Sequence, residues 1–407
     1  MSDMDSARRA EPGDEAIDEV LDEGGYEGVE RGYEGVERSD DVLGGVGVAP
    51  ASRSERHRPR RGGFFRRHKA LLALLILLGL VAGGVAGVGL YLNKQLSGIG
   101  RFSSTVPEAA RPAPVPVEGN EEPGLTFLLA GADNGYDGSG IAETLRSGRW
   151  QPGVHRSDTM MVMHISGDRK RIYVVSIPRD TYVPVEGHGE DKINAAFSYG
   201  GPSLMQQTVE QFTGIRMDHV AVIDWNGFKD LSTALGGVTV YIPADVYDPM
   251  HRYQWTKGEH TLMGDEALEY VRTRYGLAGG DFDRIQRQQN FLREMLRKLV
   301  SKGTLTNPVT LNDSVGAITR NLVVDDALSN QAIGQLALSL KDIRTDDVTF
   351  LTIPITSFGT TAAGASVLNA DKPVTTALFQ ALAAEKMPQF LLNNPGIGQL
   401  KAPNQVR

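Results

Sequence analysis

The apolar positions of this 407-residue chain change their spacing several times, and each spacing predicts a different element. Residues 70–92 form an apolar run without a single charge. Residues 160–165 and 171–177 are rich in β-branched and apolar side chains, and a polar Ser-Gly-Asp-Arg-Lys stretch separates them. Two such runs around a polar turn are typical of a β-hairpin. Residues 281–300 instead have the spacing of an amphipathic helix.

The open end of this hairpin is predicted to be strongly charged. If the turn is centred just after Asp168, antiparallel register places Asp158 opposite Arg179, because cross-strand partners share a midpoint. Arg156 and Asp180 then join them in one small volume. Two guanidiniums and two carboxylates beside a sheet edge suit a metal-bridged phosphate group. The alternative is an ordinary surface ion-pair cluster, since such pairs are common and weak.

The helix at residues 281–300 changes character along its length. Asp281, Arg284 and Gln288 share one face, and nearly the same stripe continues with apolar side chains. Those apolar side chains are Leu292, Met295 and Leu299. The pattern indicates a helix that begins in a site and ends in a core. The alternative makes Asp281 an N-cap and Arg284 a solvated residue.

Further site candidates follow from position in the predicted sheet. Residues 125–131 are apolar without alternation and predict a buried strand. Asp133 comes just past its carboxyl end, where open α/β sheets place their ligands. A turn-forming aspartate is the alternative. Residues 137–153 are expected to be a flexible surface insertion.

Three basic residues complete the candidate set. If residues 272–274 are extended, Arg272 and Arg274 point the same way and make a fork for phosphate oxygens. Lys192 either steers an anion or solvates a loop.

Elements expected around these residues are strands 220–224, 238–242 and 348–355, and helices from about 201 to 212, 225–235, 264–271, 325–340 and 372–384.

Composition divides the N-terminal part of the chain. Residues 1–50 are acidic, glycine-rich and poor in apolar residues, which predicts a disordered tail. Residues 51–69 are basic. One interpretation of this segment is a patch that binds nucleic acid. The segment's position directly before the apolar run 70–92 instead favours the cytoplasmic flank of a membrane span, because lysine and arginine are enriched on that side of the membrane. The run is long enough to cross a hydrocarbon core of ~30 Å. We therefore expect a single-pass membrane protein with a cytoplasmic N-terminus, and no nucleic-acid partner.

The part beyond the span is expected to lie outside the cell. Residues 93–122 are proline-rich and predict an extended linker. Residues 123–394 are long enough for one large α/β domain, and residues 395–407 are expected to form a loose tail. The chain has no cysteine, which excludes disulfides, thiol catalysis and thiolate metal sites.

Glycines within the apolar run leave one further possibility open. Gly79, Gly83 and Gly87 are spaced so that two membrane helices can approach closely, which would give a homodimer. Glycine is frequent in membrane helices in any case. The glycine spacing therefore does not decide whether the membrane helix forms a homodimer.

Seven ordered blocks between residues 128 and 289 resemble the LytR–CpsA–Psr family of cell-wall assembly proteins. The blocks are LLAGAD, RSDTMM, SIPRDTYV, KINAAFSYGG, ALGGV, EALEYVRTR and GDFDRIQRQQ. The resemblance implies a three-layer α/β/α sandwich around a mixed central sheet, preceded by a single transmembrane helix. It also implies a Mg²⁺-assisted phosphotransferase. Such an enzyme moves an anionic glycopolymer from a polyprenyl-pyrophosphate carrier to peptidoglycan, outside the cell.

By motif, the resemblance assigns roles to the candidates. Asp133 and Asp158 would hold Mg²⁺, and Asp281 would take the proton of the acceptor hydroxyl. The residues implied to bind the pyrophosphate are Arg156, Arg179, Lys192, Arg272, Arg274, Arg284 and Gln288, with Arg179 and Arg274 also taking part in catalysis. The first block departs from the family pattern, because Gly135 stands where an arginine is usual.

Two other functions fit the same residues. One is a pyrophosphatase that releases the carrier monophosphate to water. The other is a membrane-anchored regulator that binds polyprenyl phosphate without turning it over. The sequence contains neither a Gly-x-Ser-x-Gly nor a His-Glu-x-x-His motif, which disfavours serine-hydrolase and zinc-protease chemistry.

Overall fold

The computed structural model describes residues 91, 93–118, 122–133, 135, 140–148 and 150–407. The predicted acidic tail, basic segment and membrane span lie outside these residues, apart from Tyr91. The glycines proposed to pair membrane helices also lie outside them. Within the described part of the chain, no helix is long and apolar enough to cross a membrane.

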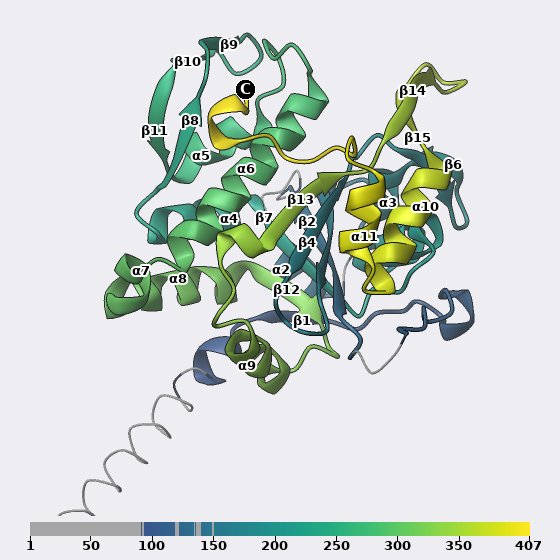
Figure 1. Cartoon of the computed structure of the whole chain (residues 1–407), viewed down its shortest axis with the longest axis horizontal. Coiled ribbons are helices and arrows are strands. Elements are labelled where there is room, and N and C mark those ends of the chain that lie inside the picture. The colour runs from purple at the N-terminus through teal and green to yellow at the C-terminus, as the bar shows by residue number, and fades with distance from the viewer. Residues whose placement is uncertain (1–90, 92, 119–121, 134, 136–139, 149) are drawn as a thin grey trace, which may run out of the picture. The chain divides into compact units, whose positions relative to one another are not determined.

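A seven-stranded mixed sheet forms the centre of the domain, in the order β1-β12-β7-β2-β3-β4-β13 (Figure 1). Its strands are β1 (Gly100–Phe102), β2 (Leu125–Ala132), β3 (Ser157–Ile165), β4 (Ile172–Ile177), β7 (His219–Asp224), β12 (Leu322–Asp325) and β13 (Val348–Thr352). β2 lies between β7, with which it is parallel, and β3, with which it is antiparallel. The mixed central sheet predicted for the chain is confirmed.

In the part of the chain that the structure describes, four two-stranded sheets lie outside the central one. They are β5 (Tyr182–Val185) with β6 (Gly189–Lys192), β8 (Val238–Ile242) with β11 (Gly258–Leu262), β9 (Val246–Asp248) with β10 (Tyr253–Trp255), and β14 (Ile355–Thr360) with β15 (Ser366–Ala370). Within the described residues, the α-helices are α2 (Ile141–Arg146), α3 (Ile193–Thr213), α4 (Trp225–Ala234), α5 (Gly264–Arg272), α6 (Asp281–Leu299), α7 (Lys302–Thr306), α8 (Pro308–Asn321), α9 (Asn330–Ser339), α10 (Lys372–Ala383) and α11 (Met387–Asn393).

Helices cover both faces of the sheet because its inner strands are apolar on both faces. In β3, Met160 and Val162 pack in the cluster that includes α3, α10 and α11. The alternate residue Met161 packs on the other face with the apolar half of α6. Side chains of a strand alternate between faces, so a nearly continuous apolar run predicts this burial on both sides. The result is a three-layer arrangement.

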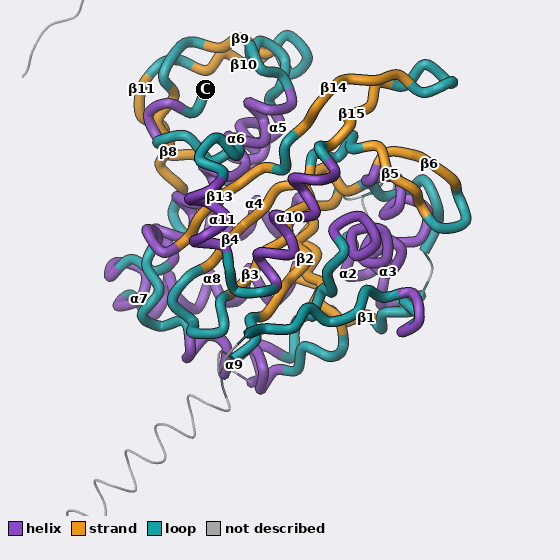
Figure 2. The backbone as a smooth tube through the Cα atoms, turned by 45° about the vertical axis from the view of Figure 1, so that its right-hand side comes forward, coloured by secondary structure: helices purple, strands orange, loops and turns teal. Residues whose placement is uncertain are grey.

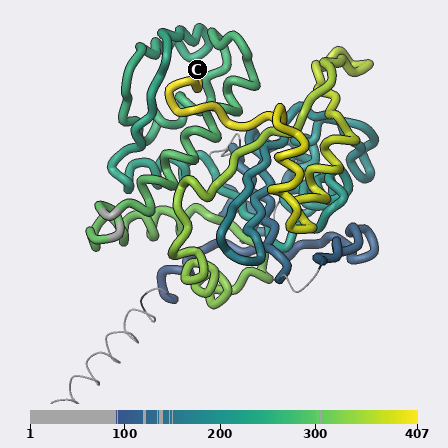
Figure 3. Tube along the Cα trace, in the orientation of Figure 1, coloured from purple at the N-terminus to yellow at the C-terminus, as the bar shows by residue number. Residues whose placement is uncertain are grey.

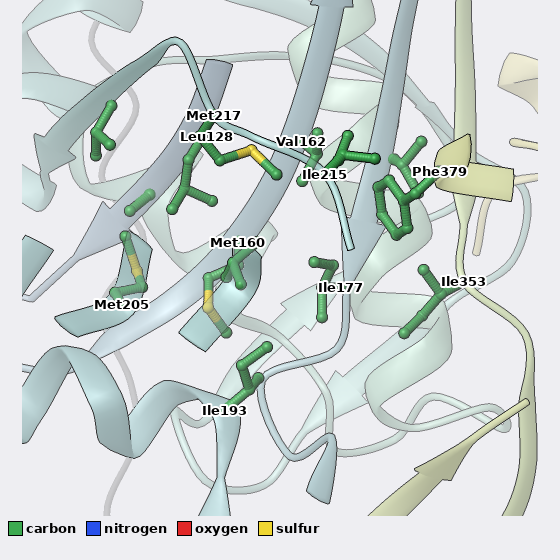
Figure 4. Close-up of a cluster of buried hydrophobic side chains, with 14 of the residues drawn as sticks. Leu128, Met160, Val162, Ile177, Ile193, Met205, Ile215, Met217, Ile353 and Phe379 are labelled. Carbon is green, nitrogen blue, oxygen red and sulfur yellow. The ribbon is translucent and has the colours of Figure 1, made fainter. Parts of the chain in front are cut away.

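The central strands and α3 contribute fully buried side chains to this packed core. Met160 is 1% exposed, and Val220 and Met205 are fully buried. Figure 4 shows Met160 and Met205 among the neighbouring core side chains.

The predicted linker at residues 93–122 is largely part of the domain. β1 pairs in parallel with β12 and forms one edge of the central sheet. Arg111 donates to the buried carboxylate of Glu210 from Nη2 at 2.7 Å. The prediction of a free spacer was wrong here, because a three-residue edge strand leaves only a weak pattern and the salt bridge joins residues distant in sequence.

The last residues are packed, whereas the sequence predicted a loose tail at 395–407. Leu400 donates its backbone N–H to Phe350 O, which continues the sheet beyond β13. Val406 is fully buried, and Arg287 of α6 donates to the carbonyl of Arg407 at 2.7 Å. Figure 3 shows this yellow stretch crossing from the region of α11 toward the green helices. The sequence did not predict these contacts, because the segment is polar and its contacts are made mainly by its backbone.

Three local predictions also need correction. Asp325 ends β12, and α9 is capped by Ser329 instead. α3 begins at Ile193 and has a kink at Gly200 and Gly201, the point where the sequence placed its start. The expected surface insertion contains α2, whose Ile141 is fully buried. The start of α9 is set by the Ser329 side chain, which accepts from the N–H of Ala332, whereas Ile193 and Ile141 at the starts of α3 and α2 are fully buried.

Candidate functional site

The β3–β4 hairpin brings Asp158 and Arg179 together. Its register pairs Met160 with Ile177, which places Asp158 opposite Arg179 as predicted. The Arg179 Nη1 to Asp158 Oδ1 distance is 2.5 Å. A bulge between β2 and β3 at Gly131 leaves Asp158 without a partner on β2. Bulges re-aim side chains at functional sites, and this one occurs at the charged end of the hairpin.

The segment after β4 adds a second ion pair to the first. Asp180 Oδ2 lies 3.8 Å from Arg179 Nε, and its Oδ1 lies 2.8 Å from Lys192 Nζ. Lys192 is the residue before α3, and the N–H of Asn194 donates to the carbonyl of Arg179. The start of α3 therefore holds the backbone at Arg179. Of the two interpretations of Lys192, the structure favours membership of the charged cluster.

The first turns of α6 supply the opposite side of this cluster. Arg284 Nη2 lies 3.1 Å from Asp281 Oδ2, and Arg274 Nη1 lies 3.8 Å from Asp281 Oδ1. The Arg284 side chain is only 7% exposed, which a solvated residue would not be. The side chain of Asp281 makes no capping hydrogen bond at the helix start. Asp281 is therefore not the N-cap, which is Gly280, and Arg284 is not a solvated residue.

The pKa directions show that the two sides act on each other. Burial lowers the pKa of Arg179, but the charges of Asp158, Asp180 and Asp281 outweigh it and raise that pKa above its ordinary value. Burial lowers the pKa of Arg284, and repulsion by Arg179 and by Arg274 adds to this although Asp281 opposes it. The guanidinium of Arg284 is therefore incompletely neutralised. An added anion would relieve that repulsion.

Two hydrogen-bond donors in the cluster have no acceptor among the described residues. They are the buried Nε–H groups of Arg179 and Arg284. A buried donor without an acceptor is costly unless a ligand completes it. Arg179 and Arg284 belong to elements far apart in the chain. Their donors suit the oxygens of one phosphate group.

Asp133 is positioned at the end of β2 by the neighbouring end of β3. Its Oδ1 accepts from the N–H of Arg156 at 2.9 Å, and Arg156 Nε lies 3.6 Å from Oδ2. Gly135 has φ +74°, and a Cβ there would lie 2.7 Å from the ring of the buried His155. An arginine is thus sterically excluded at position 135. Sequence reasoning missed His155, although it directly precedes the RSDTMM block.

Arg272 and Gln288 are not joined to the charged cluster by any described contact. Arg272 ends α5, so the extended fork expected with Arg274 is not formed. Its guanidinium lies 4.2 Å from the ring centroid of Trp225 and 3.7 Å from Glu269. Gln288 donates to the carbonyl of Val271 instead.

Arg272 nevertheless lies at the same edge of the sheet as Asp133. Trp225 follows β7, whose last residue Asp224 pairs with Ala132. Asp133 and Trp225 thus leave parallel neighbouring strands at the same end. Sequence reasoning missed Trp225 because nothing local indicates that a distant arginine stacks on it.

The carboxylates at this edge fit a magnesium ion in kind and number. Mg²⁺ prefers hard oxygen ligands and commonly takes one or two carboxylates, with water and phosphate oxygens completing the octahedron. Asp133 and Asp158 flank the same end of the β2–β3 pair, and no described contact uses Asp158 Oδ2. The described residues contain no cluster of three or more acidic, histidine or cysteine ligands. A site built from two carboxylates and a phosphate is consistent with both observations.

A separate cavity of about 290 Å³ lies at the closed end of the same hairpin. Its lining includes Ser166, Asp168 and Glu385. This is the end of the strands opposite Asp158. The cavity is therefore distinct from the charged cluster and is not the candidate site.

Comparison with known proteins agrees with the fold and the motifs. The LytR_cpsA_psr family model matches residues 99–384, and the chain belongs to this family. Cell wall biosynthesis protein LcpA of Corynebacterium glutamicum is 35% identical over 307 residues, which are 67% of this chain and 58% of LcpA. The chain therefore spans less than two thirds of the length of LcpA.

Shorter relatives are matched over nearly their whole length. A protein of Halalkalibacterium halodurans named polyisoprenyl-teichoic acid–peptidoglycan teichoic acid transferase TagU is 30% identical, covering 70% of this chain and 93% of the relative. Among solved structures, B. subtilis TagT is 26% identical with a TM-score of 0.50, covering 69% of this chain and 98% of TagT. TagT bound to LI-WTA is 27% identical with a TM-score of 0.51 and the same coverage.

Proposed function

We propose that this protein transfers an anionic glycopolymer from a polyprenyl-pyrophosphate carrier to a hydroxyl group of peptidoglycan. The observation that carries the proposal is the meeting of Arg179 and Arg284, each with a buried and unpaired Nε–H, beside Asp158 and Asp281. The name of the TagU relative supports the same class of donor and acceptor.

The reaction forms one P–O bond and breaks another. The acceptor hydroxyl attacks the phosphorus that carries the glycopolymer, and the polyprenyl monophosphate leaves. Such transition states are loose, so catalysis consists mostly of positioning and fixed positive charge. Arg179 and Arg284 would bind non-bridging oxygens where charge accumulates. Arg274 is held at this position by Asp281.

Asp281 is the residue that would receive the acceptor's proton. Its carboxylate lies between Arg284 and Arg274, which orient it. In a loose transition state the hydroxyl proton leaves late, so orientation of the hydroxyl matters more than basicity.

Asp133 and Asp158 would hold Mg²⁺ against the pyrophosphate. The ion would supply charge neutralisation to the leaving phosphate and a template for its oxygens. Arg156 fixes Asp133 from the side by its backbone N–H, and Arg179 fixes Asp158. Both carboxylates are thus held in place by neighbouring cationic residues.

The setting that suits this chemistry is the outer face of the cell membrane. Residues 70–92 would anchor the chain, with residues 1–69 in the cytoplasm and the domain outside. The acceptor and the carrier-linked donor would then both be within reach of the domain.

The test uses the full-length protein in detergent with a polyprenyl-pyrophosphate-linked glycopolymer, Mg²⁺ and peptidoglycan. Transfer predicts polymer covalently attached to peptidoglycan and release of carrier monophosphate in equal amount. Release of monophosphate without attachment would make the protein a pyrophosphatase. Carrier binding without any product would make it a regulator.

A further inference from the structure

The β14–β15 hairpin carries an exposed aromatic side chain beside the charged cluster. Phe358, on β14, is 73% exposed. Its ring lies 6.2 Å from the ring of Phe282, at an interplanar angle of 89°. We call Phe282 and Phe358 the aromatic rim. Figures 1 and 2 show the hairpin extending away from the body of the domain.

Each half of the aromatic rim is attached to one side of the charged cluster. Phe282 directly follows Asp281 on α6 and is half-buried. Phe358 pairs across the hairpin with Leu368, whose N–H donates to the carbonyl of Asp180. A bulge at the base of β14, between Ile355 and Ser357, re-aims the strand there. The rim therefore connects the segment that carries Asp281 with the one that carries Asp180.

The chemistry of the hairpin indicates what it binds. Residues 355–370 contain no charged side chain and no histidine. Thr360 presents an exposed hydroxyl group on the same face as Phe358, because side chains two residues apart in a strand share a face. Ser357 and Asn369 hydrogen-bond each other on the opposite face. An aromatic ring beside a neutral hydroxyl group suits an uncharged sugar ring. It does not suit an anionic polymer or a pyrophosphate, which need cationic donors.

We propose that the aromatic rim is the subsite for the acceptor glycan of peptidoglycan, in which a sugar ring of the chain packs against Phe358. The inference rests on the proposed transferase function and names where its acceptor lies. A sugar seated on Phe358 and Phe282 would place a neighbouring hydroxyl near Asp281, the residue next to the rim. Phe358 is thus a positioning residue and takes no part in the chemical step.

A membrane surface is the other partner that an exposed phenylalanine could suggest. The position of the hairpin argues against it. The described chain enters the domain beside α8 and α9, where Tyr91 and Gln95 contact Asn312 and Ser97 follows. In Figures 1 and 2 these two helices lie low in the view, and the β14–β15 hairpin extends from the upper part. The hairpin also lacks the lysine or arginine that attracts anionic lipid headgroups.

The test measures transfer by the full-length protein at increasing concentrations of peptide-free glycan strands. Phe358→Ala is expected to raise the half-saturating glycan concentration about three- to tenfold, because contacts with an aromatic ring are of that size. The maximal rate should stay within about twofold. Phe358→Tyr should behave like the wild type, since it keeps the ring. Leu338→Ala is the matched control, because Leu338 on α9 is 71% exposed.

Two outcomes separate this inference from the proposed function. If the wild type transfers polymer and Phe358→Ala has an unchanged half-saturating glycan concentration, the rim is not the acceptor subsite and the transferase stands. If direct titration shows that glycan binding depends on Phe358 but no transfer occurs, the transferase proposal fails and the subsite stands.

The membrane alternative has its own readout. Phe358→Trp protein is reconstituted in phosphatidylglycerol vesicles with brominated acyl chains, which quench the emission of an inserted indole. The subsite predicts no more quenching than in the wild type. Additional quenching would place the side chain in the bilayer and would overturn the inference.

Discussion

Asp158 and Arg179 face each other across the open end of the β3–β4 hairpin, with Oδ1 and Nη1 2.5 Å apart. The pair joins a bulged strand end to the segment that leads into α3. The charge of Asp281 on α6, more than 100 residues further along the chain, also raises the pKa of Arg179. The hairpin thus contributes one half of a site whose other half is a helix end.

Arg179→Ala is expected to lower the rate of transfer by about 10²–10³, or ~2.7–4 kcal/mol, by analogy with the loss of one oxyanion donor. The reason is that Arg179 presents a buried, unpaired Nε–H at the cluster. Single-turnover transfer measures the effect. Arg297→Ala removes an exposed arginine from the far end of α6 and should leave transfer unchanged. Near-wild-type transfer by Arg179→Ala would remove this residue from the site.

Asp133→Asn is expected to raise the Mg²⁺ concentration needed for half-maximal transfer. The substitution removes the charge but keeps Oδ1 as the acceptor for the N–H of Arg156, so the local backbone should persist. Losing one of two carboxylate ligands weakens a hard-cation site. A Mg²⁺ titration after treatment with a chelator measures the change, with Asp342→Asn on the exposed surface as the control. Full activity of the wild type in excess chelator would contradict a role for the ion.

The charged half of the site on the hairpin could be predicted because antiparallel register is a matter of counting. Once Asp168 is placed in the turn, Asp158 and Arg179 must meet, and the register agrees. The polar first turns of α6 were equally informative, since helical spacing placed Asp281 and Arg284 on one face. Both patterns depend on residues that are close together in sequence, so they could be predicted without knowledge of the tertiary packing.

Other parts of the site depend on tertiary contacts that no local pattern contains. Arg272 was expected to be extended, but it packs on Trp225 at the end of a helix. The β14–β15 hairpin consists mainly of small and polar residues, which are also typical of loops. The hydrogen bond from the N–H of Leu368 to the carbonyl of Asp180 gives the hairpin a defined position. The edge strand β1 is only three residues long. Its pairing with β12 depends on residues more than 200 positions away.

Arg111→Met is expected to destabilise the domain by about 3–5 kcal/mol, because it leaves the buried carboxylate of Glu210 without its cation. The hydrogen bond to Glu210 is also the main reason that the pKa of Arg111 lies above its ordinary value. Denaturant unfolding of the wild type and the variant measures the difference.

The double variant Arg111→Met/Glu210→Gln should recover much of the lost stability, because it removes the buried charge together with its partner. Arg320→Met on α8 is the control for replacing an arginine at the surface. Equal stability of wild type and Arg111→Met would show that the pair with Glu210 does not attach the segment around Arg111 to the domain.

Asp325 should make the stability of the domain depend on pH in the acid range. Burial raises the pKa of its carboxyl, but hydrogen bonds from His219 and from the N–H groups of Val220 and Leu328 outweigh burial and hold that pKa below the ordinary 3.8. The unfolded carboxyl therefore takes up its proton at a higher pH than the folded one. The stabilisation is complete above the unfolded pKa, and it is lost as pH falls through the lower, folded pKa.

Urea unfolding between pH 2 and about pH 6 measures this contribution. The wild type should lose stability steeply below about pH 4. Asp325→Asn should be less stable near neutral pH by about 1–3 kcal/mol, since an amide replaces a charged acceptor, and its stability should fall less with acid. Asp342→Asn, at an exposed site, should follow the wild-type curve. Parallel pH profiles for the wild type and Asp325→Asn would show that the hydrogen bonds at the end of β12 do not favour the ionised carboxylate.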